Sequence, residues 1–294
     1  MNILITGCNG QLGNEIQSLQ GNFPNHRFFN TDIQNVCSSV RNYSQLDITD
    51  SVAVNAFVEE HNIEGIVNCA AFTAVDKAEE EETFCRLLNA EAPAILAKAM
   101  GERNGWIIHV STDYVFDGTS HMPYTEDVAT SPQSVYGKTK LDGERAVLEL
   151  CKEAVVIRTA WLYSEYGKNF VKTMKTLGET RDSLSVVFDQ IGTPTYALDL
   201  ANTIITIVEK GIKPGTYHFS NEGVTSWYDF TKAIHRIAGI TSCHVRPIHT
   251  HEYPTPACRP AYSVLDKTKI KNVYGIHIPH WEESLEKCMA NMQE

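Results

Sequence analysis

The chain has 294 residues, of which 43% are hydrophobic and 21% are charged, and this composition is typical of a globular protein with one or two domains. Its formal net charge at pH 7 is −11, which argues against nucleic acid as a partner because an acidic surface repels a phosphate backbone. An anionic small molecule is still compatible with this charge, provided that local cations or helix N-termini hold it.

The eight cysteines are spread along the chain, and no two of them form a CxxC pair. This distribution is unlike a disulfide scaffold or a zinc site, so we expect reduced thiols, a cytoplasmic location and no assigned metal ligand. No stretch approaches the run of about 18 apolar residues that a membrane span needs, and the N-terminal sequence MNILITGCNG leads directly into a strand and a turn. We therefore expect neither a membrane partner nor a secretion signal.

Short apolar runs alternate with helical patterns over the first part of the chain. The runs that predict strands are NILIT (2–6), RFFNTD (27–32), part of SQLDITD (44–50), EGIVNCAA (64–71), WIIHVS (106–111) and AVVIRT (154–159). The segments with helical spacing are 10–20, 51–62, 79–100 and 134–151. This alternation predicts an α/β fold with a Rossmann-like, doubly wound parallel sheet, which binds ligands beyond the carboxyl ends of its strands.

After residue 160 the alternation becomes less regular. Helical spacing recurs at 168–178, 196–211 and 226–239, a strand is expected at 215–220, and a loop is expected at 247–262, which contains four prolines. Ser226 is placed to cap the helix that follows it. We expect this part of the chain to form a small C-terminal lobe that packs on the sheet.

The sequence TGCNGQLG (6–13) places three glycines directly after the first strand and at the start of a helix. In a dinucleotide-binding turn, Gly7 would permit the tight turn, Gly10 would let the backbone approach a pyrophosphate, and Gly13 would allow the helix to pack closely on the sheet. The N–H groups at the helix N-terminus would bind phosphate. The spacing here is GxxGxxG, and a plain strand–helix turn is the alternative.

Asp32 ends the second predicted strand, where a carboxylate can accept hydrogen bonds from the adenosine ribose and would repel a 2′-phosphate. This position favours NADH over NADPH, and a solvated turn acid is the alternative. We therefore expect residues 1–160 to form a dinucleotide-binding domain, with segments near 185–220 returning to it. Residues 161–294 are expected to form mainly a substrate-binding lobe.

The sequence SVYGKTK places Tyr136 and Lys140 one helical turn apart, and Thr112 stands at the carboxyl end of the fifth predicted strand. Alone, the Tyr-x-x-x-Lys pair could be two ordinary residues on one helical face. In this context, however, a hydroxyl, a phenol and an ammonium group would converge at the binding edge of the sheet. A lysine cation near the phenol is expected to lower the tyrosine pKa, which is near 10 in free tyrosine. The pattern predicts a proton-transfer site.

Together these elements resemble the extended short-chain dehydrogenase/reductase family and, more narrowly, the dTDP-4-dehydrorhamnose reductases. The matching segments are GQLG (10–13), NCAAFTAVDKAE (68–79), STDYVFDG (111–118), VYGKTKLDGE (135–144), RTAWLY (158–163), DQIGTPT (189–195) and RPAYSVLD (259–266). They span nearly the whole chain, and STDYVFDG and AVDKAE are the most specific of them. The segment 33–45 departs from the family pattern.

The resemblance implies that NADH or NADPH reduces the 4-keto group of dTDP-4-dehydro-L-rhamnose to give dTDP-L-rhamnose for cell-surface polysaccharide. It implies cofactor contacts at Gly10, Gln11, Leu12, Asp47, Ile48, Ala71, Phe72, Thr73, Val110, Tyr136 and Lys140. It implies sugar contacts at Thr112, Asp113, Tyr136, Lys140 and Trp161. The alternative role for Trp161 is that of an aromatic residue in the core. The alternative role for Asp113 is to cap a turn.

One departure from a neighbouring family narrows the chemistry. The related sugar-nucleotide dehydratases have a sequence like Thr-Asp-Glu at this site, whereas this chain has Thr112-Asp113-Tyr114. The second acid is missing, so an elimination reaction that needs two acids is disfavoured. Two other functions stay open: a nucleotide-sugar epimerase that keeps its NAD, and a non-catalytic regulatory subunit that binds the cofactor, since the regulatory subunit of methionine adenosyltransferase resembles this family too. The resemblance is also compatible with a homodimer.

Overall fold

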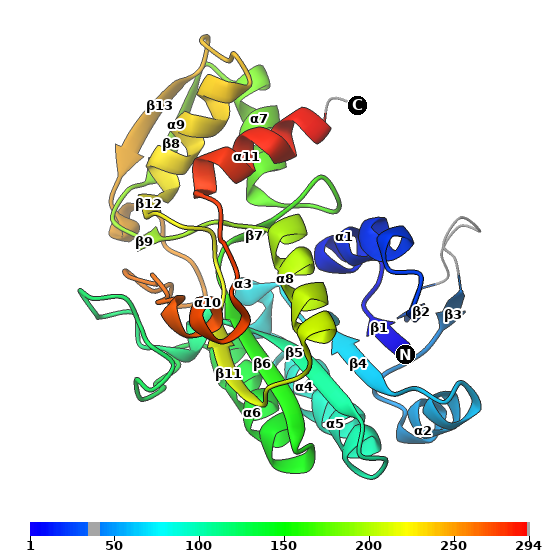
Figure 1. The fold of residues 1–294 in the computed structure, drawn as a ribbon. Coiled ribbons are helices and arrows are strands. Elements are labelled where there is room, and N and C mark those ends of the chain that lie inside the picture. The colour runs from blue at the N-terminus through cyan, green and yellow to red at the C-terminus, as the bar shows by residue number, and fades with distance from the viewer. Residues whose placement is uncertain (35–41, 293–294) are drawn as a thin grey trace.

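The computed structural model describes residues 1–34 and 42–292, and its centre is a parallel sheet of seven strands (Figure 1). In spatial order the strands are β11 (Gly215–His218), β6 (Glu153–Thr159), β5 (Trp106–Thr112), β4 (Gly65–Asn68), β1 (Asn2–Thr6), β2 (Arg27–Asp32) and β3 (Tyr43–Gln45). The chain winds outward from β1 in both directions, so the strand order reverses between β1 and β4. This arrangement confirms the predicted doubly wound fold and places its ligand-binding edge at the carboxyl ends of these strands.

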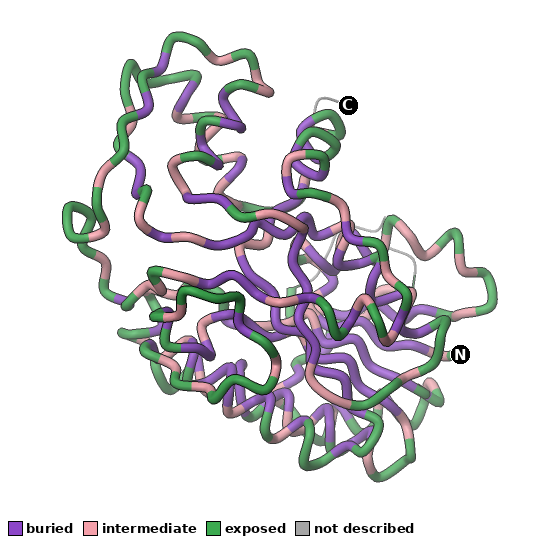
Figure 2. The backbone as a smooth tube through the Cα atoms, turned by 60° about the vertical axis from the view of Figure 1, so that its left-hand side comes forward, coloured by how far each residue is buried: buried purple, intermediate pink, exposed green. Residues whose placement is uncertain are grey.

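Alternate residues of each strand face opposite sides of the sheet, and two hydrophobic clusters result. In β1, Ile3 and Ile5 belong to the cluster covered by helices α1 (Gln11–Leu19), α8 (Ala197–Lys210) and α10 (Thr268–Tyr274). Leu4 belongs to the opposite cluster, covered by α2 (Ser51–Glu60), α5 (Ala92–Gly101) and α6 (Val135–Leu150). Because both faces are covered, the inner strands β2, β1, β4, β5 and β6 are buried along most of their length, as Figure 2 shows.

The helix expected over 79–100 is divided. A short helix, α3 (Val75–Ala78), comes first, and α4 (Glu82–Arg86) then continues through a π-helical segment, Leu87–Glu91, into α5. The wider π turn ends at Glu91, two residues before Pro93, and lets the helix continue past a residue that lacks an N–H group.

The C-terminal lobe contains a second, smaller layer of helices and strands, in the upper part of Figure 1. Its elements are α7 (Phe170–Thr180), α9 (Trp227–Ile237), α11 (Trp281–Asn291) and the parallel pair β8 (Ser183–Val187) and β13 (His244–Ile248). Two short pairs, β7 (Leu162–Tyr163) with β10 (Thr195–Tyr196) and β9 (Ile191–Gly192) with β12 (Thr225–Ser226), lie between lobe and sheet. Single 3-10 turns occur at Gln20–Asn22, Asp113–Val115 and Thr250–Glu252.

Two details of the lobe can be compared with the sequence pattern. The Ser226 hydroxyl accepts a hydrogen bond from the Asp229 N–H at 3.0 Å, which confirms the predicted cap of α9. The loop expected over 247–262 is wrong at its start, because β13 extends to Ile248. Pro247 is tolerated there because β13 pairs with one neighbour only, so its missing N–H group costs no ladder bond.

The chain returns from the lobe to the main sheet and leaves it again. Helix α8 packs against α1, and β11 pairs with β6 at the edge of the seven-stranded sheet, whereas β8 lies in the lobe. The return therefore begins near Ala197. Among the residues that the structure describes, no helix is long and apolar enough to cross a membrane.

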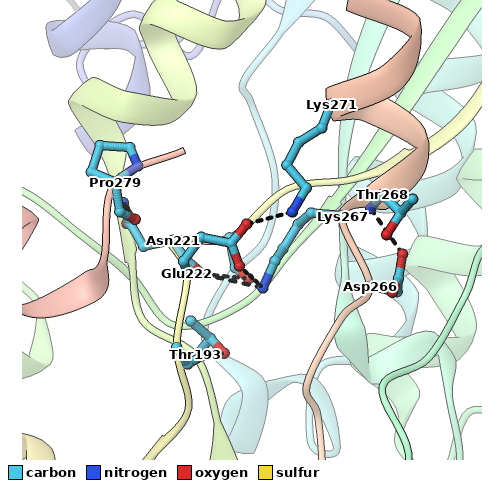
Figure 3. A network of polar contacts seen from close by, with 10 residues as sticks. Thr193, Asn221, Glu222, Asp266, Lys267, Thr268, Lys271 and Pro279 are labelled. Atoms are coloured by element: carbon cyan, nitrogen blue, oxygen red, sulfur yellow. Dashed lines mark hydrogen bonds and ion pairs between the residues drawn. The ribbon is translucent and has the colours of Figure 1, made fainter. Parts of the chain in front are cut away.

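A charged network ties the connection after β11 to α10 (Figure 3). The Glu222 carboxylate pairs with Lys271 at 2.7 Å and with Lys267 at 3.4 Å, and the Lys267 ammonium also donates to the Asn221 carbonyl. Lys267 is only 7% exposed, so burial lowers its pKa. Burial opposes ionisation of Glu222 as well, but the two lysines outweigh it and hold the Glu222 pKa below its usual value.

Replacing Glu222 by glutamine is expected to destabilise the fold by about 1–3 kcal/mol, because the ammonium of Lys267 stays buried without its counter-charge. Since the folded-state pKa of Glu222 is lowered, its contribution is present above the unfolded-state pKa and is lost as the pH falls through the folded-state pKa. Urea denaturation at pH 7 and pH 4 measures both effects. The exposed Glu60→Gln variant is the control, and an equal loss in both variants would contradict the assignment.

Candidate active site

The glycine turn joins β1 to α1 and approaches the neighbouring strand closely. Gly7 has a φ of +64°, and a Cβ atom at this position would lie 2.7 Å from the Ala70 backbone. A Cβ on Gly13 would lie 2.5 Å from the Cys8 Cα. Gly10 caps α1 without a side-chain hydrogen bond, so the first N–H groups of this helix are available to a phosphate.

Asp32 lies beside this turn, at the end of β2. One carboxylate oxygen accepts a hydrogen bond from the Asn9 N–H at 3.1 Å, which fixes the side chain against the glycine turn. The segment 33–45, which departs from the family pattern, includes residues 35–41, and these lie outside the described residues.

A cleft of about 910 Å³ runs along the carboxyl ends of the strands. The predicted site residues that line it are Gly7, Gly10, Gln11, Leu12, Gly13, Asp32, Asp47, Ile48, Ala71, Thr73, Val110, Thr112, Asp113, Tyr136, Lys140 and Trp161. Residues from seven separate parts of the sequence thus meet in one cavity. Within the described chain, no group of three or more His, Cys, Asp or Glu side chains is arranged to hold a metal ion.

Phe72 lies between the two cleft residues Ala71 and Thr73 but is not itself among the residues that line the cleft, so its cofactor contact stays a prediction. The ring packs in a small cluster with Ala78 and Cys85. Its backbone N–H donates to the Asn89 side chain at 2.8 Å, and the Asn89 amide donates back to the Phe72 carbonyl at 3.0 Å. Asn89 lies in the π-helical segment, so the widened turn holds the chain after β4 in place.

At the end of β5, Thr112 and Asp113 form a linked pair. The Thr112 hydroxyl donates to the Asp113 carboxylate at 2.9 Å and accepts from the Tyr114 N–H at 3.2 Å. Burial raises the Asp113 pKa to about 6, although hydrogen bonds from Thr112 and Ser263 partly oppose the shift. The Tyr136 phenol also lies within hydrogen-bonding reach of the Thr112 hydroxyl, so the two oxygens converge.

Tyr136 and Lys140 lie in the first turns of α6, whose N-cap Ser134 accepts from the Gly137 N–H at 3.1 Å. Lys140 is 2% exposed, and its ammonium donates to the Val110 carbonyl at 2.6 Å. Burial lowers the Lys140 pKa to about 8, although the Glu144 carboxylate opposes this shift. The ammonium is therefore close to its titration range at physiological pH.

The net shift of the Tyr136 pKa in the free protein is upward, opposite to the direction expected from the spacing to Lys140. Burial raises the pKa of the Tyr136 phenol, and the Asp113 carboxylate raises it further. Surrounding protein thus disfavours the phenolate more than nearby groups favour it. The phenol is consequently held as a proton donor, which is the form that reduction of a carbonyl requires.

Trp161 stands at the lobe side of the cleft in an unusual conformation, with φ at +49°. Its ring stacks on Trp227, with ring centroids 3.5 Å apart and an angle of 12° between the planes. Such a φ is strained for a bulky residue, and it places the indole at the wall of the cleft. Trp161 is thus both a packed aromatic and a cleft residue.

Several residues at the lobe side of the cleft have no local sequence signal. Trp227 and Arg259 both line the cleft, and the Arg259 guanidinium pairs with Asp76 at 2.6 Å. From the sequence, Trp227 is the first residue of a predicted helix and Arg259 lies in a predicted loop, so neither pattern indicates a cleft residue. The family-matching segments AVDKAE and RPAYSVLD, which contain Asp76 and Arg259, are the sequence feature that could indicate this part of the site.

Comparison with known proteins gives the family. The family described as the RmlD substrate binding domain matches residues 1–294. The chain belongs to the RmlD family. A dTDP-4-dehydrorhamnose reductase of Aggregatibacter actinomycetemcomitans is 41% identical over 298 residues, and the match covers 98% of each chain.

Solved structures agree with this RmlD family membership. A dTDP-4-dehydrorhamnose reductase of Clostridium acetobutylicum superposes with a TM-score of 0.92 at 44% identity over 100% of both chains. Another from Bacillus anthracis, solved in complex with NADP, has a TM-score of 0.90 at 37% identity over 99% of both chains. The resemblance to the dTDP-4-dehydrorhamnose reductases is confirmed.

Proposed function

We propose that this protein reduces the 4-keto group of dTDP-4-dehydro-L-rhamnose to give dTDP-L-rhamnose, with NADH or NADPH as the reductant. The observation that carries the proposal is the convergence of Thr112, Tyr136 and Lys140 in one cleft with the glycine turn. The family membership supports it over the epimerase and the regulatory subunit. The glycine turn between β1 and α1 fits a dinucleotide. The turn has no room for side chains at Gly7 and Gly13, and α1 offers free N–H groups to the phosphates.

When bound, the reduced nicotinamide would supply a hydride to carbon 4 of the sugar. In this mechanism the Tyr136 phenol donates its proton to the carbonyl oxygen, which completes the alcohol, and the raised phenol pKa keeps that proton in place beforehand. The Thr112 hydroxyl polarises and orients the carbonyl. The Lys140 ammonium stabilises the negative charge that develops on the phenol and would hydrogen-bond the nicotinamide ribose.

We further propose that residues 1–160 serve the dinucleotide and that the lobe of residues 161–294 serves the sugar nucleotide. Trp161, Trp227 and Arg259 support this division, since the lobe side contributes them to the cleft. An aromatic wall suits a sugar or base, and a guanidinium suits a diphosphate. We also propose a cytoplasmic location and a homodimer, and sedimentation of the purified protein tests the pairing.

The experiment that tests the function mixes the protein with NADH or NADPH and dTDP-4-dehydro-L-rhamnose and follows the absorbance of the reduced nicotinamide. One cofactor molecule is expected to be oxidised for each sugar reduced. Turnover without net oxidation would indicate the epimerase, and cofactor binding without turnover would indicate the regulatory subunit. The UDP form of the same sugar tests the preference for the nucleotide base.

The cofactor preference follows from Asp32. NADH is expected to be used at least as well as NADPH, because a carboxylate and a 2′-phosphate about 4 Å apart repel each other by about 1 kcal/mol even in a water-like medium. Asp32→Ser should shift the ratio of the two kcat/KM values toward NADPH by about fivefold. The NADP complex of the Bacillus anthracis relative makes this a discriminating test.

Asp47→Asn is the matched control for Asp32→Ser. The Asp47 carboxylate also lines the cleft, but it accepts hydrogen bonds from the Thr49 N–H at 2.9 Å and from the Thr49 hydroxyl at 2.7 Å. Its replacement should change both cofactor affinities alike. If the unmodified protein already prefers NADPH by about tenfold or more, Asp32 does not face the ribose and the argument is wrong.

A further inference from the structure

A row of buried polar side chains crosses the sheet beneath the catalytic lysine. The Thr6 hydroxyl on β1 lies 2.6 Å from the Asn68 side-chain oxygen on β4, and the Asn68 amide lies 3.0 Å from Nδ1 of His109 on β5. Nε2 of His109 then faces the Lys140 ammonium on α6 at 3.5 Å. Thr6, Asn68 and His109 are all 0% exposed. Three adjacent strands thus present one continuous polar path that ends at Lys140.

His109 has no part in the mechanism described above. It is absent from the described residues that line the cleft, so it touches neither the cofactor nor the sugar. An imidazole is nevertheless costly to bury without hydrogen bonds. Burial, together with the charge on Lys140, holds the His109 pKa well below its usual value, so the ring is neutral.

The charge on Lys140 decides which nitrogen of the neutral ring carries the proton. An N–H at Nε2 would point its positive end at the ammonium, whereas a lone pair at Nε2 accepts a hydrogen bond from it. Nδ1 then carries the proton and donates it to the Asn68 carbonyl oxygen. This choice turns the Asn68 amide so that its NH₂ group faces Thr6, an orientation that heavy-atom positions alone do not distinguish.

The lysine ammonium has three N–H donors, and the protein fixes the direction of two of them. One goes to the Val110 carbonyl at 2.6 Å and a second to His109 Nε2. The third is left for the cleft, which Lys140 lines. We propose that His109 is a positioning residue for the reduction: its Nε2 lone pair holds the Lys140 ammonium in the orientation that engages the nicotinamide ribose.

The other groups that face Lys140 cannot replace this contact. The Glu144 carboxylate lies one turn further along α6, but it is bound by Arg158 at 2.7 Å and by the Ser111 hydroxyl at 2.5 Å. The thiols of Cys69 and Cys85 also lie near Lys140, and burial raises the pKa of both, so they are neutral. Within the described chain, His109 is therefore the uncharged nitrogen acceptor directed at Lys140.

The first test measures the tautomer in the unmodified protein. The ¹⁵N chemical shifts of His109 should show a protonated Nδ1 and an unprotonated Nε2 between pH 6 and pH 7, where the ring is neutral and the lysine mostly charged. This measurement needs neither substrate nor turnover, so it is independent of the proposed function on which the kinetic role rests. A protonated Nε2 would overturn the proposal.

The second test compares two variants of similar size, His109→Gln and His109→Met. Glutamine keeps an oxygen that can accept from Lys140, whereas methionine offers only a weak acceptor. For the methionine variant, the pH at which NADH affinity falls on the alkaline side should move down by about 1 unit, which corresponds to one lost hydrogen bond to a charged group. The glutamine variant should recover most of that shift, and kcat should follow the same order.

His218→Met is the matched control. His218 is also a histidine of 0% exposure in the sheet, but it lies on β11 with Nδ1 3.1 Å from the Tyr124 carbonyl. Its replacement should lower the thermal stability without moving the alkaline limb of NADH binding, that is, the pH at which NADH affinity falls on the alkaline side. An alkaline limb that is equally displaced in His109→Met and His218→Met, or unmoved in His109→Met, would reduce His109 to a structural role and overturn the proposal. If His109→Met does not fold, the tautomer measurement still decides.

Discussion

Tyr136→Phe is expected to lower kcat by about 10²–10⁴-fold, the usual contribution of a positioned general acid, while the affinity for NADH stays within about twofold. The substitution removes one oxygen and leaves the ring, which packs edge-on against Tyr114 with ring centroids 5.5 Å apart. The fold should therefore survive. Stopped assays of sugar reduction and fluorescence titration with NADH measure the two quantities separately.

Tyr114→Phe is the matched control, since it removes the same atom from the neighbouring ring in the same cleft. Its effect on kcat should stay below about tenfold, because Tyr114 is assigned no proton transfer. Thr112→Val should cost less than Tyr136→Phe, since Thr112 only orients the carbonyl. Near-normal kcat in Tyr136→Phe at unchanged NADH affinity would show that the tyrosine and the lysine merely share a helical face.

The parts of the site that could be predicted from the sequence are those held by local spacing and by the rules of parallel sheets. The glycine turn follows β1 directly, and Thr112 ends β5, so both must lie at the carboxyl edge of the sheet. Tyr136 and Lys140 are one helical turn apart, so they must share a face of α6. Within the Rossmann-like part of the fold, short-range patterns and topology are sufficient.

The remainder depends on contacts between distant segments. Trp227 reaches the cleft by stacking on Trp161, and Asn89 holds the backbone of Phe72. Neither partner is near in sequence, so no local pattern carries the information. The raised pKa of Tyr136 has the same origin, because burial is set by the packing of several elements around the phenol, whereas the spacing from Lys140 shows only one of its neighbours.

Glu144→Leu is expected to lower the free energy of unfolding by about 3–5 kcal/mol, the cost of breaking a buried ion pair by removing one partner. Glu144 on α6 is 2% exposed and Arg158 on β6 is 5% exposed. The guanidinium donates to this carboxylate from Nε at 2.9 Å and from Nη2 at 2.7 Å, and the Phe116 ring lies 5.1 Å from its central carbon. Without Glu144, this charge stays buried among apolar and neutral groups. Equilibrium urea denaturation measures the loss.

The double variant Glu144→Leu/Arg158→Met should recover much of that stability, because it removes both charges and leaves none buried without a partner. Glu149→Leu, on the exposed side of the same helix, is the control and should change stability by no more than about 0.5 kcal/mol. A double variant as unstable as the sum of the two single variants would show that packing, and not the unpaired charge, causes the loss.

Because Glu144 also raises the Lys140 pKa, the alkaline limb of NADH binding should move to lower pH in the double variant even where stability has returned. The free energy of unfolding and the pH profile of NADH binding would then separate two roles of the Glu144 carboxylate: it pairs with Arg158, and it raises the Lys140 pKa.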